Sequence, residues 1–158
     1  MYSNASPLLI NSSAIEIKKL QVLLMKCSRP ILGYQSLKWS TSKIMSKLNW
    51  LTIPHMIAKE SILFLHKISF ENIPKSLFNL YTYSHNNSKN IRTNRKIMVK
   101  NISNSEIVKK SLVFKSVYLM NTLPDEIIKY NTKKLSKYLQ TNIQSYFHSD
   151  KICAYENG

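Results

Sequence analysis

The chain has 158 residues and a formal net charge of +15, with 44% hydrophobic and 10% aromatic residues. This length fits one domain with one core, and the composition is that of a globular rather than an unstructured chain. Only two glycines occur, Gly33 and Gly158, which argues against glycine-rich phosphate loops and tight-turned β architectures.

The positive charge allows two interpretations. A large excess of basic residues is typical of proteins that bind nucleic acid or an anionic membrane surface. The chain is also rich in Lys, Asn, Ile and Tyr, which AT-rich genes over-supply, and its arginines are only Arg29, Arg92 and Arg95. Base readout draws on the planar fork of Arg, so this lysine-rich set favours contact with phosphates over contact with bases.

Cysteine and histidine show no metal-ligand spacing. Cys27 and Cys153 form no C-x-x-C pair, and the four histidines are scattered. No signal peptide and no membrane-spanning stretch is evident. We therefore expect an intracellular protein of the nucleus or cytoplasm, not secreted, without a metal or cofactor.

Residues 1–11 are expected to be a disordered leader, and residues 12–80 the N-terminal helices of a single helical domain. Ser13 and Glu16 have capping-box spacing at the start of a helix over 12–29. Helical periodicity predicts that this helix buries one face, and that Pro30 ends or kinks it before a cap at Gly33. The residues of that face are Ile17, Leu20, Leu24 and Cys27.

A short second helix over 40–51 is expected to be capped by Ser40 or Thr41. The third helix, over 53–72, starts near Pro54 and carries an apolar face wide enough to pack on two sides. Another short helix is expected to start at Pro74.

Residues 81–105 are expected to form a long basic Asn/Ser-rich loop that contains no acidic residue. A loop of this length in a small domain is usually functional or disordered. Its basic residues are the strongest candidates for phosphate contact. They are Lys89, Arg92, Arg95, Lys96 and Lys100.

Residues 106–148 are expected to be the C-terminal helices of the same domain, followed by a frayed tail over 149–158. Leu123 is expected to enter the core, and Pro124 to start a turn in which Asp125 and Glu126 favour the positive helix end. Thr132 is expected to cap the last helix. The fold class is thus all-α, an irregular bundle of about five to six helices with a long basic loop in the middle.

No catalytic constellation is evident. Two-metal polymerase or nuclease chemistry needs clustered carboxylates, whereas Asp125 and Asp150 lie far apart in sequence. A nucleophile elbow and a phosphate-cradling glycine loop are also missing.

The order of these signals resembles the C-terminal region, after the catalytic palm, of reverse transcriptases from non-LTR retrotransposons, particularly jockey-like elements of insects. The resemblance covers roughly residues 15–147. A Leu-Gln helix, a short helix ending in Trp-Leu, a Pro-x-x-Leu step and an Asn-x-Leu-Pro-x-x-Ile motif occur in the family order. The matching positions are Leu20, Gln21, Lys26, Cys27, Arg29, Ile31, Gly33, Ile44, Met45, Leu48, Trp50, Leu51, Pro74, Leu77, Arg92, Asn121, Leu123, Pro124 and Ile127. Leu135 stands where the family has Phe.

The resemblance implies a non-catalytic fragment of an RNA-directed DNA polymerase, without the palm carboxylates, that contacts the backbone of RNA or DNA non-specifically. Lys26 and Arg29, which lie in a matched segment, join the loop residues as candidate contacts. Departures from the family pattern include Met120, where an aromatic residue is usual, and Pro30. No small-molecule substrate is expected.

Two other interpretations remain open. The chain could be a helical protein-interaction module recruited from such a remnant, with its charge incidental. An exposed apolar patch would favour that function. The third is a membrane-surface helix over 133–147, although Tyr146 and Phe147 fit a core better.

Overall fold

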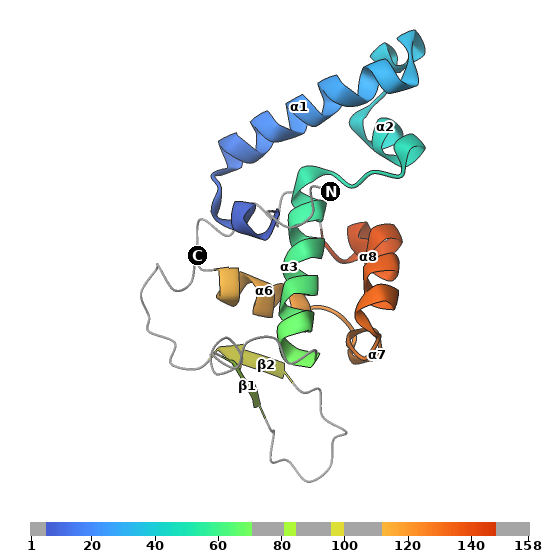
Figure 1. Ribbon diagram of the computed structural model, residues 1–158. Helices are drawn as coiled ribbons and strands as arrows, with labels where there is room; N and C mark the ends of the chain where they lie inside the picture. The colour runs from blue at the N-terminus through green and yellow to red at the C-terminus, as the bar shows by residue number, and fades with distance from the viewer. Residues whose placement is uncertain (1–5, 71–80, 85–95, 100–111, 148–158) are drawn as a thin grey trace.

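The computed structural model describes residues 6–70, 81–84, 96–99 and 112–147 (Figure 1). The fold is all-α, as expected. Its described residues form six α-helices, two 3-10 helices and one two-stranded antiparallel sheet. The elements are η1 (Ser6–Asn11), α1 (Ala14–Leu32), η2 (Tyr34–Lys38), α2 (Thr41–Leu48), α3 (Ile53–Phe70), β1 (Tyr81–Ser84), β2 (Lys96–Val99), α6 (Leu112–Asn121), α7 (Asp125–Ile128) and α8 (Thr132–Tyr146).

Helix α3 is the centre of the domain (Figure 1). It contacts α6, α8, η1 and α1, which confirms the expectation that its apolar residues pack on more than one side. Burial of these side chains is the main source of stability, at roughly 25 cal/mol per Å² of apolar surface. The residues of the main core are Ile10, Ile17, Leu51, Ile57, Ala58, Ile62, Leu63, Leu119, Leu123, Ile127, Leu135, Leu139, Ile143 and Phe147.

Helix α1 begins as its sequence predicts. The backbone N–H of Ser13 donates to the Glu16 carboxylate at 2.8 Å, and the Glu16 N–H donates to the Ser13 hydroxyl oxygen at 3.3 Å, so the capping box is complete. The helix does not end at Pro30 but continues to Leu32. Gly33 forms the cap, and its N–H donates to the Arg29 carbonyl.

Two expectations in the N-terminal part are wrong. Residues 6–11 of the supposed leader form η1, and Ile10 is buried in the core because η1 contacts α3 and α6. Cys27 is exposed rather than buried, because α1 turns the neighbouring Ser28 inward. Residues 1–5 lie outside the described part of the chain.

Polar side chains tie α1, α2 and α8 to the central helix and to each other. The Gln21 side-chain oxygen accepts from the backbone N–H of Ile53 at 2.8 Å, which fixes α1 at the start of α3. Gln140 on α8 accepts from the Lys59 ammonium and donates to the Asn49 carbonyl. These long-range bonds hold α1 and α2 beside the core although both extend away from it in Figure 1.

The segment between α6 and α8 has the buried leucine and the short helical turn that the sequence predicts. Leu123 is buried, and Asp125 and Glu126 stand in the first turn of α7, where the helix dipole favours acids. The cap of α8 is Asn131, one residue before the expected Thr132. Its side chain accepts from the Lys134 N–H at 2.8 Å.

The expected loop over 81–105 contains regular structure at two places. Tyr81–Ser84 pairs antiparallel with Lys96–Val99, with Tyr81 opposite Val99. Residues 85–95 and 100–105 lie outside the described residues. The same holds for the expected helix at Pro74, the first residues (106–111) of the expected C-terminal helices and the tail over 149–158.

Candidate nucleic-acid interface

Most of the predicted loop contacts fall outside the described residues. This is the case for Lys89, Arg92, Arg95 and Lys100. The backbone of Lys96 is described, and it begins β2 opposite Ser84. The structure therefore gives Lys96 a defined place at one end of a sheet, while phosphate contact by the loop stays a prediction.

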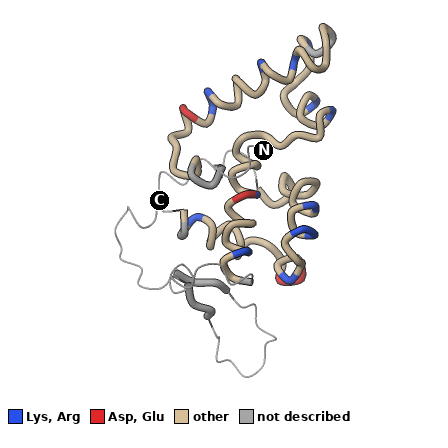
Figure 2. The backbone as a smooth tube through the Cα atoms, in the orientation of Figure 1, with Lys and Arg blue, Asp and Glu red and all other residues tan. Residues whose placement is uncertain are grey.

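The other two predicted contacts lie on one helix. Lys26 is exposed on α1, and Arg29 follows one turn later and is half-buried. Residues three apart on a helix are surface neighbours, so these two cations share one side of α1. Helix α1 contacts α2, which carries further exposed lysines, Lys43 and Lys47. Figure 2 shows basic positions on both helices.

A second basic surface lies on α8. Lys133, Lys134 and Lys137 are all exposed in its first two turns, and we call them the α8 lysine cluster (Figure 2). Lys129 precedes them at the end of α7 and is also exposed. Among the described residues, no carboxylate forms an ion pair with any lysine of this cluster. All three side chains are exposed, and the Lys134 ammonium also lies over the Tyr130 ring.

The position of the cluster is unfavourable for the helix itself. The first turn of α8 contains no acid, and two lysines stand there beside the positive end of the helix dipole. A cation at that end typically destabilises a helix by about 0.3–1 kcal/mol. Backbone N–H groups and lysines together create a positive potential that an external anion would neutralise.

Tyrosines border the cluster on one side. The Lys134 ammonium lies 3.9 Å from the centre of the Tyr130 ring, and Tyr130 meets Tyr138 edge to face at 6.0 Å between centroids. The Tyr138 and Tyr146 hydroxyl groups are 2.8 Å apart. This hydrogen bond is the main reason that the pKa of Tyr138 lies above its ordinary value, with burial and the charge of Tyr146 adding to it.

Two further titratable side chains, Glu60 and His66, lie on α3. Within the described ranges, no three or more His, Cys, Asp or Glu side chains converge as a metal site would require. Glu60 stands beside Lys59 and Lys67, and its pKa is raised because burial outweighs their attraction. Buried His66 bonds Thr132 Oγ1 and the Ile128 carbonyl, so its role is to join α3 to the α7–α8 turn.

None of the described helices combines the length and apolarity needed to cross a bilayer. From the sequence, the lysines of 133–147 suggested only a membrane-surface helix and not a phosphate contact. A usable signal was nevertheless present in the sequence: two lysines and no acid closely follow Asn131, a good N-cap residue.

Comparison with known proteins adds no relative: no family model, no curated protein and no solved structure matches this chain.

Proposed function

We propose that this chain is a non-catalytic helical protein of the nucleus or cytoplasm that binds RNA or DNA through phosphate contacts, without reading base sequence. The observation that carries the proposal is the α8 lysine cluster: Lys133 and Lys134 are exposed at the positive end of a helix that has no acid in its first turn, and exposed Lys137 follows in the second turn. Lysines act as point charges, which suit phosphate neutralisation better than base readout.

Affinity for single-stranded RNA and for duplex DNA should fall as salt rises. Each phosphate contact contributes a log–log slope of about −0.7 to −0.9. Replacing Lys133, Lys134 and Lys137 with Gln should reduce the slope by roughly two to three units. The matched control replaces Lys18, Lys38 and Lys67 with Gln, which removes the same charge from exposed positions on α1, η2 and α3.

Equal effects of the two triple variants would contradict a localised site, because a diffuse charge of +15 has no preferred contact. A far-UV circular dichroism spectrum of each variant checks that the helices are retained. The same design applies to the loop, where neutralising Arg92, Arg95 and Lys96 together tests the sequence-based prediction.

We propose further that the chain derives from the tail of a non-LTR retrotransposon reverse transcriptase. This rests on the ordered motifs that end in Asn121, Leu123, Pro124 and Ile127. The nucleotide sequence upstream of the Met1 codon tests it: an adjoining palm-coding region, intact or interrupted, is expected. The purified chain should show no primer extension with Mg²⁺ or Mn²⁺, because the sequence lacks paired carboxylates.

The second candidate function is a protein-interaction module. One observation favours it: Ile15, Val22 and Leu23 are exposed on α1 by 67%, 54% and 55%. Three large apolar side chains on one side of a helix form a patch of the kind that marks interaction surfaces.

A further inference from the structure

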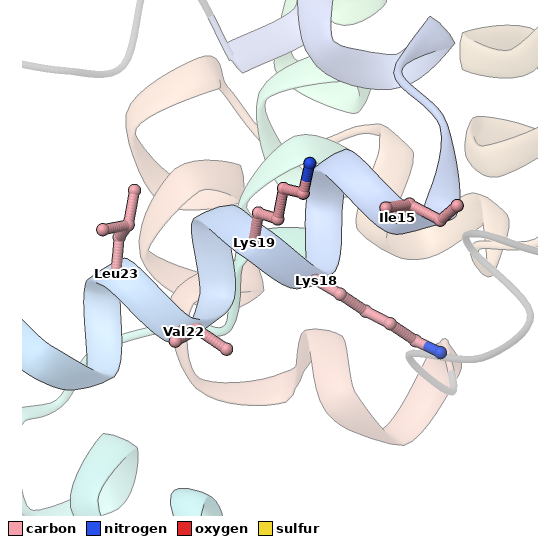
Figure 3. A pocket seen from close by; sticks show the side chains of 5 residues that line it. All are labelled: Ile15, Lys18, Lys19, Val22 and Leu23. Atoms are coloured by element: carbon pink, nitrogen blue, oxygen red, sulfur yellow. The ribbon is translucent and has the colours of Figure 1, made fainter.

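One side of α1 has the composition of a binding surface and is used by no described contact of the core. We call it the α1 outer face, and it consists of Ile15, Lys18, Lys19, Val22, Leu23 and Lys26. The first five border one shallow and largely open depression, and Figure 3 shows their side chains extending from successive turns.

The opposite side of α1 attaches the helix to the domain. Ile17 and Ser28 are buried there, and Gln21 accepts the hydrogen bond from Ile53. The apolar residues of the outer face are therefore not needed to dock α1. Exposed Ile and Val are also poor choices for helix formation, because their branched side chains lose rotamer freedom.

Apolar and basic residues alternate on this face. Helix neighbours lie three or four positions apart, and Lys18 and Lys19 are such neighbours of both Ile15 and Val22. Lys26 is a neighbour of Val22 and Leu23 in the same way. The only acid of α1, Glu16, is held in the capping box with Ser13. A complementary ligand must therefore offer apolar groups and negative charges at the same helical spacing.

This alternation of apolar and basic residues favours one class of binding partner over the others. A second copy of the chain would bring lysines against lysines, which is unfavourable. A bilayer surface favours a continuous apolar side, with the lysines on the opposite side of the helix. Nucleic acid would use the lysines but would leave Ile15, Val22 and Leu23 exposed to water. A protein helix with both apolar and acidic residues satisfies both sets of groups.

We infer that the α1 outer face binds an acidic amphipathic helix of a protein partner. The face spans Ile15 to Lys26, about 17 Å at the helical rise of 1.5 Å per residue. It thus matches about three turns of a partner helix, whose apolar side chains would lie between those of α1 and whose Asp or Glu side chains would meet the flanking lysines. This surface is separate from the α8 lysine cluster, so the inference does not depend on nucleic-acid binding.

The probe is a synthetic peptide of roughly 20 residues, long enough to hold helical structure, with Leu at i, i+4, i+7 and i+11 and Glu at the flanking positions. A control peptide carries Lys in place of each Glu. Fluorescence anisotropy should show saturable binding of the acidic peptide to the full chain and no binding of the basic one. Backbone amide shifts in NMR spectra should change along α1 and not along α8.

The paired substitutions Val22→Ser and Leu23→Ser should weaken binding of the acidic peptide by at least about tenfold, because they remove the apolar contacts. The matched control, Ile31→Ser, removes a side chain that is 61% exposed on another side of the same helix, and it should leave binding unchanged. Lys19→Glu should weaken binding of the acidic peptide and strengthen binding of the basic peptide. Lys47→Glu on α2 should change neither affinity.

Three results would overturn the inference: no saturable binding of the acidic peptide, equal binding of the two peptides, or equal effects of Ile31→Ser and the paired variant. Binding to anionic lipid vesicles that depends on Val22 and Leu23, without peptide binding, would also overturn it in favour of a membrane surface. RNA binding by the paired variant is measured in parallel as a function of salt. If the variant still binds RNA but no peptide binds, this inference fails while the proposed nucleic-acid function stands.

Discussion

His55 at the start of α3 and Phe147 at the end of α8 are joined by a hydrogen bond of 2.8 Å between His55 Nε2 and the Phe147 carbonyl oxygen. A carbonyl only accepts, so Nε2 carries the proton and the Nδ1 atom of a neutral ring accepts from the Thr52 hydroxyl at 2.6 Å. Both His55 and Phe147 are buried. The bond closes the domain between residues 92 positions apart.

Replacing His55 with Ala should lower the free energy of unfolding by about 1–3 kcal/mol, because a buried carbonyl loses its donor. Urea denaturation followed by circular dichroism measures this. Gln144→Ala, an exposed change on α8, is the control and should stay within about 0.5 kcal/mol. A His55→Ala variant as stable as the control would show that the bond contributes nothing.

Lys133→Glu should make the protein more stable and less able to bind nucleic acid. An acid in the first turn of α8 complements the helix dipole and should add about 0.3–1 kcal/mol to the free energy of unfolding. Lys47→Glu, in the last turn of α2, should have the opposite effect on stability. Stabilisation without loss of RNA affinity would remove Lys133 from the interface.

Gly33→Ala should destabilise the protein although there is room for the added methyl group. Beyond the adjoining residues, no described atom lies within 4 Å of the position that the methyl carbon would take, but the backbone has φ +77° and ψ −176°, a region that is nearly confined to glycine. The expected loss is about 1–3 kcal/mol in thermal or urea unfolding. Asn49→Gly, at a left-handed residue that glycine tolerates, should stay within about 0.5 kcal/mol. Equal stability of Gly33→Ala and the natural chain would show that the backbone there relaxes without cost.

Glu60→Gln should stabilise the protein at neutral pH and have no effect in acid. Burial raises the pKa of Glu60 above its ordinary 4.5 in the folded state, against the attraction of Lys59 and Lys67. At pH values between the pKa of Glu60 in the unfolded chain and its pKa in the folded protein, the folded protein binds more protons than the unfolded chain. The contribution of protonated Glu60 to stability is therefore full at low pH and is lost as pH rises through the folded pKa. Urea unfolding from acid to neutral pH measures the difference, and a gain that persists below the unfolded pKa would contradict the explanation.

Tyr146→Phe should lower the pKa of Tyr138 toward its ordinary 10.0, because the hydrogen bond between their hydroxyl groups is the main cause of the upward shift. Alkaline titration of the labelled tyrosine ring carbons by NMR gives this pKa directly. Tyr34→Phe, at a side chain that is 91% exposed, should leave it unchanged. An unchanged titration in Tyr146→Phe would mean that burial alone raises the pKa.

Local rules in the sequence determined where several of the described helices begin and where α6 ends. The capping box at Ser13, the cap at Ser40, and the end of α6 before Leu123 all follow from hydrogen bonds and periodicity within a few residues. The cap of α8 is Asn131 instead of the expected Thr132. An error of one residue at a helix end is normal for predictions from local sequence.

Tertiary structure decided how far the buried side of α1 extends. Ile17 is buried as periodicity predicts, and Leu20 and Leu24 are half-buried. Apolar residues occur around much of this helix, so periodicity assigned Cys27 to the core and did not single out Ile15 or Val22 as exposed. The choice depends on where α1 meets α2 and α3, contacts made by residues distant in sequence. Which side of a helix is buried depends on both surfaces that pack together. The periodicity of one helix describes only its own surface and not that of its neighbour.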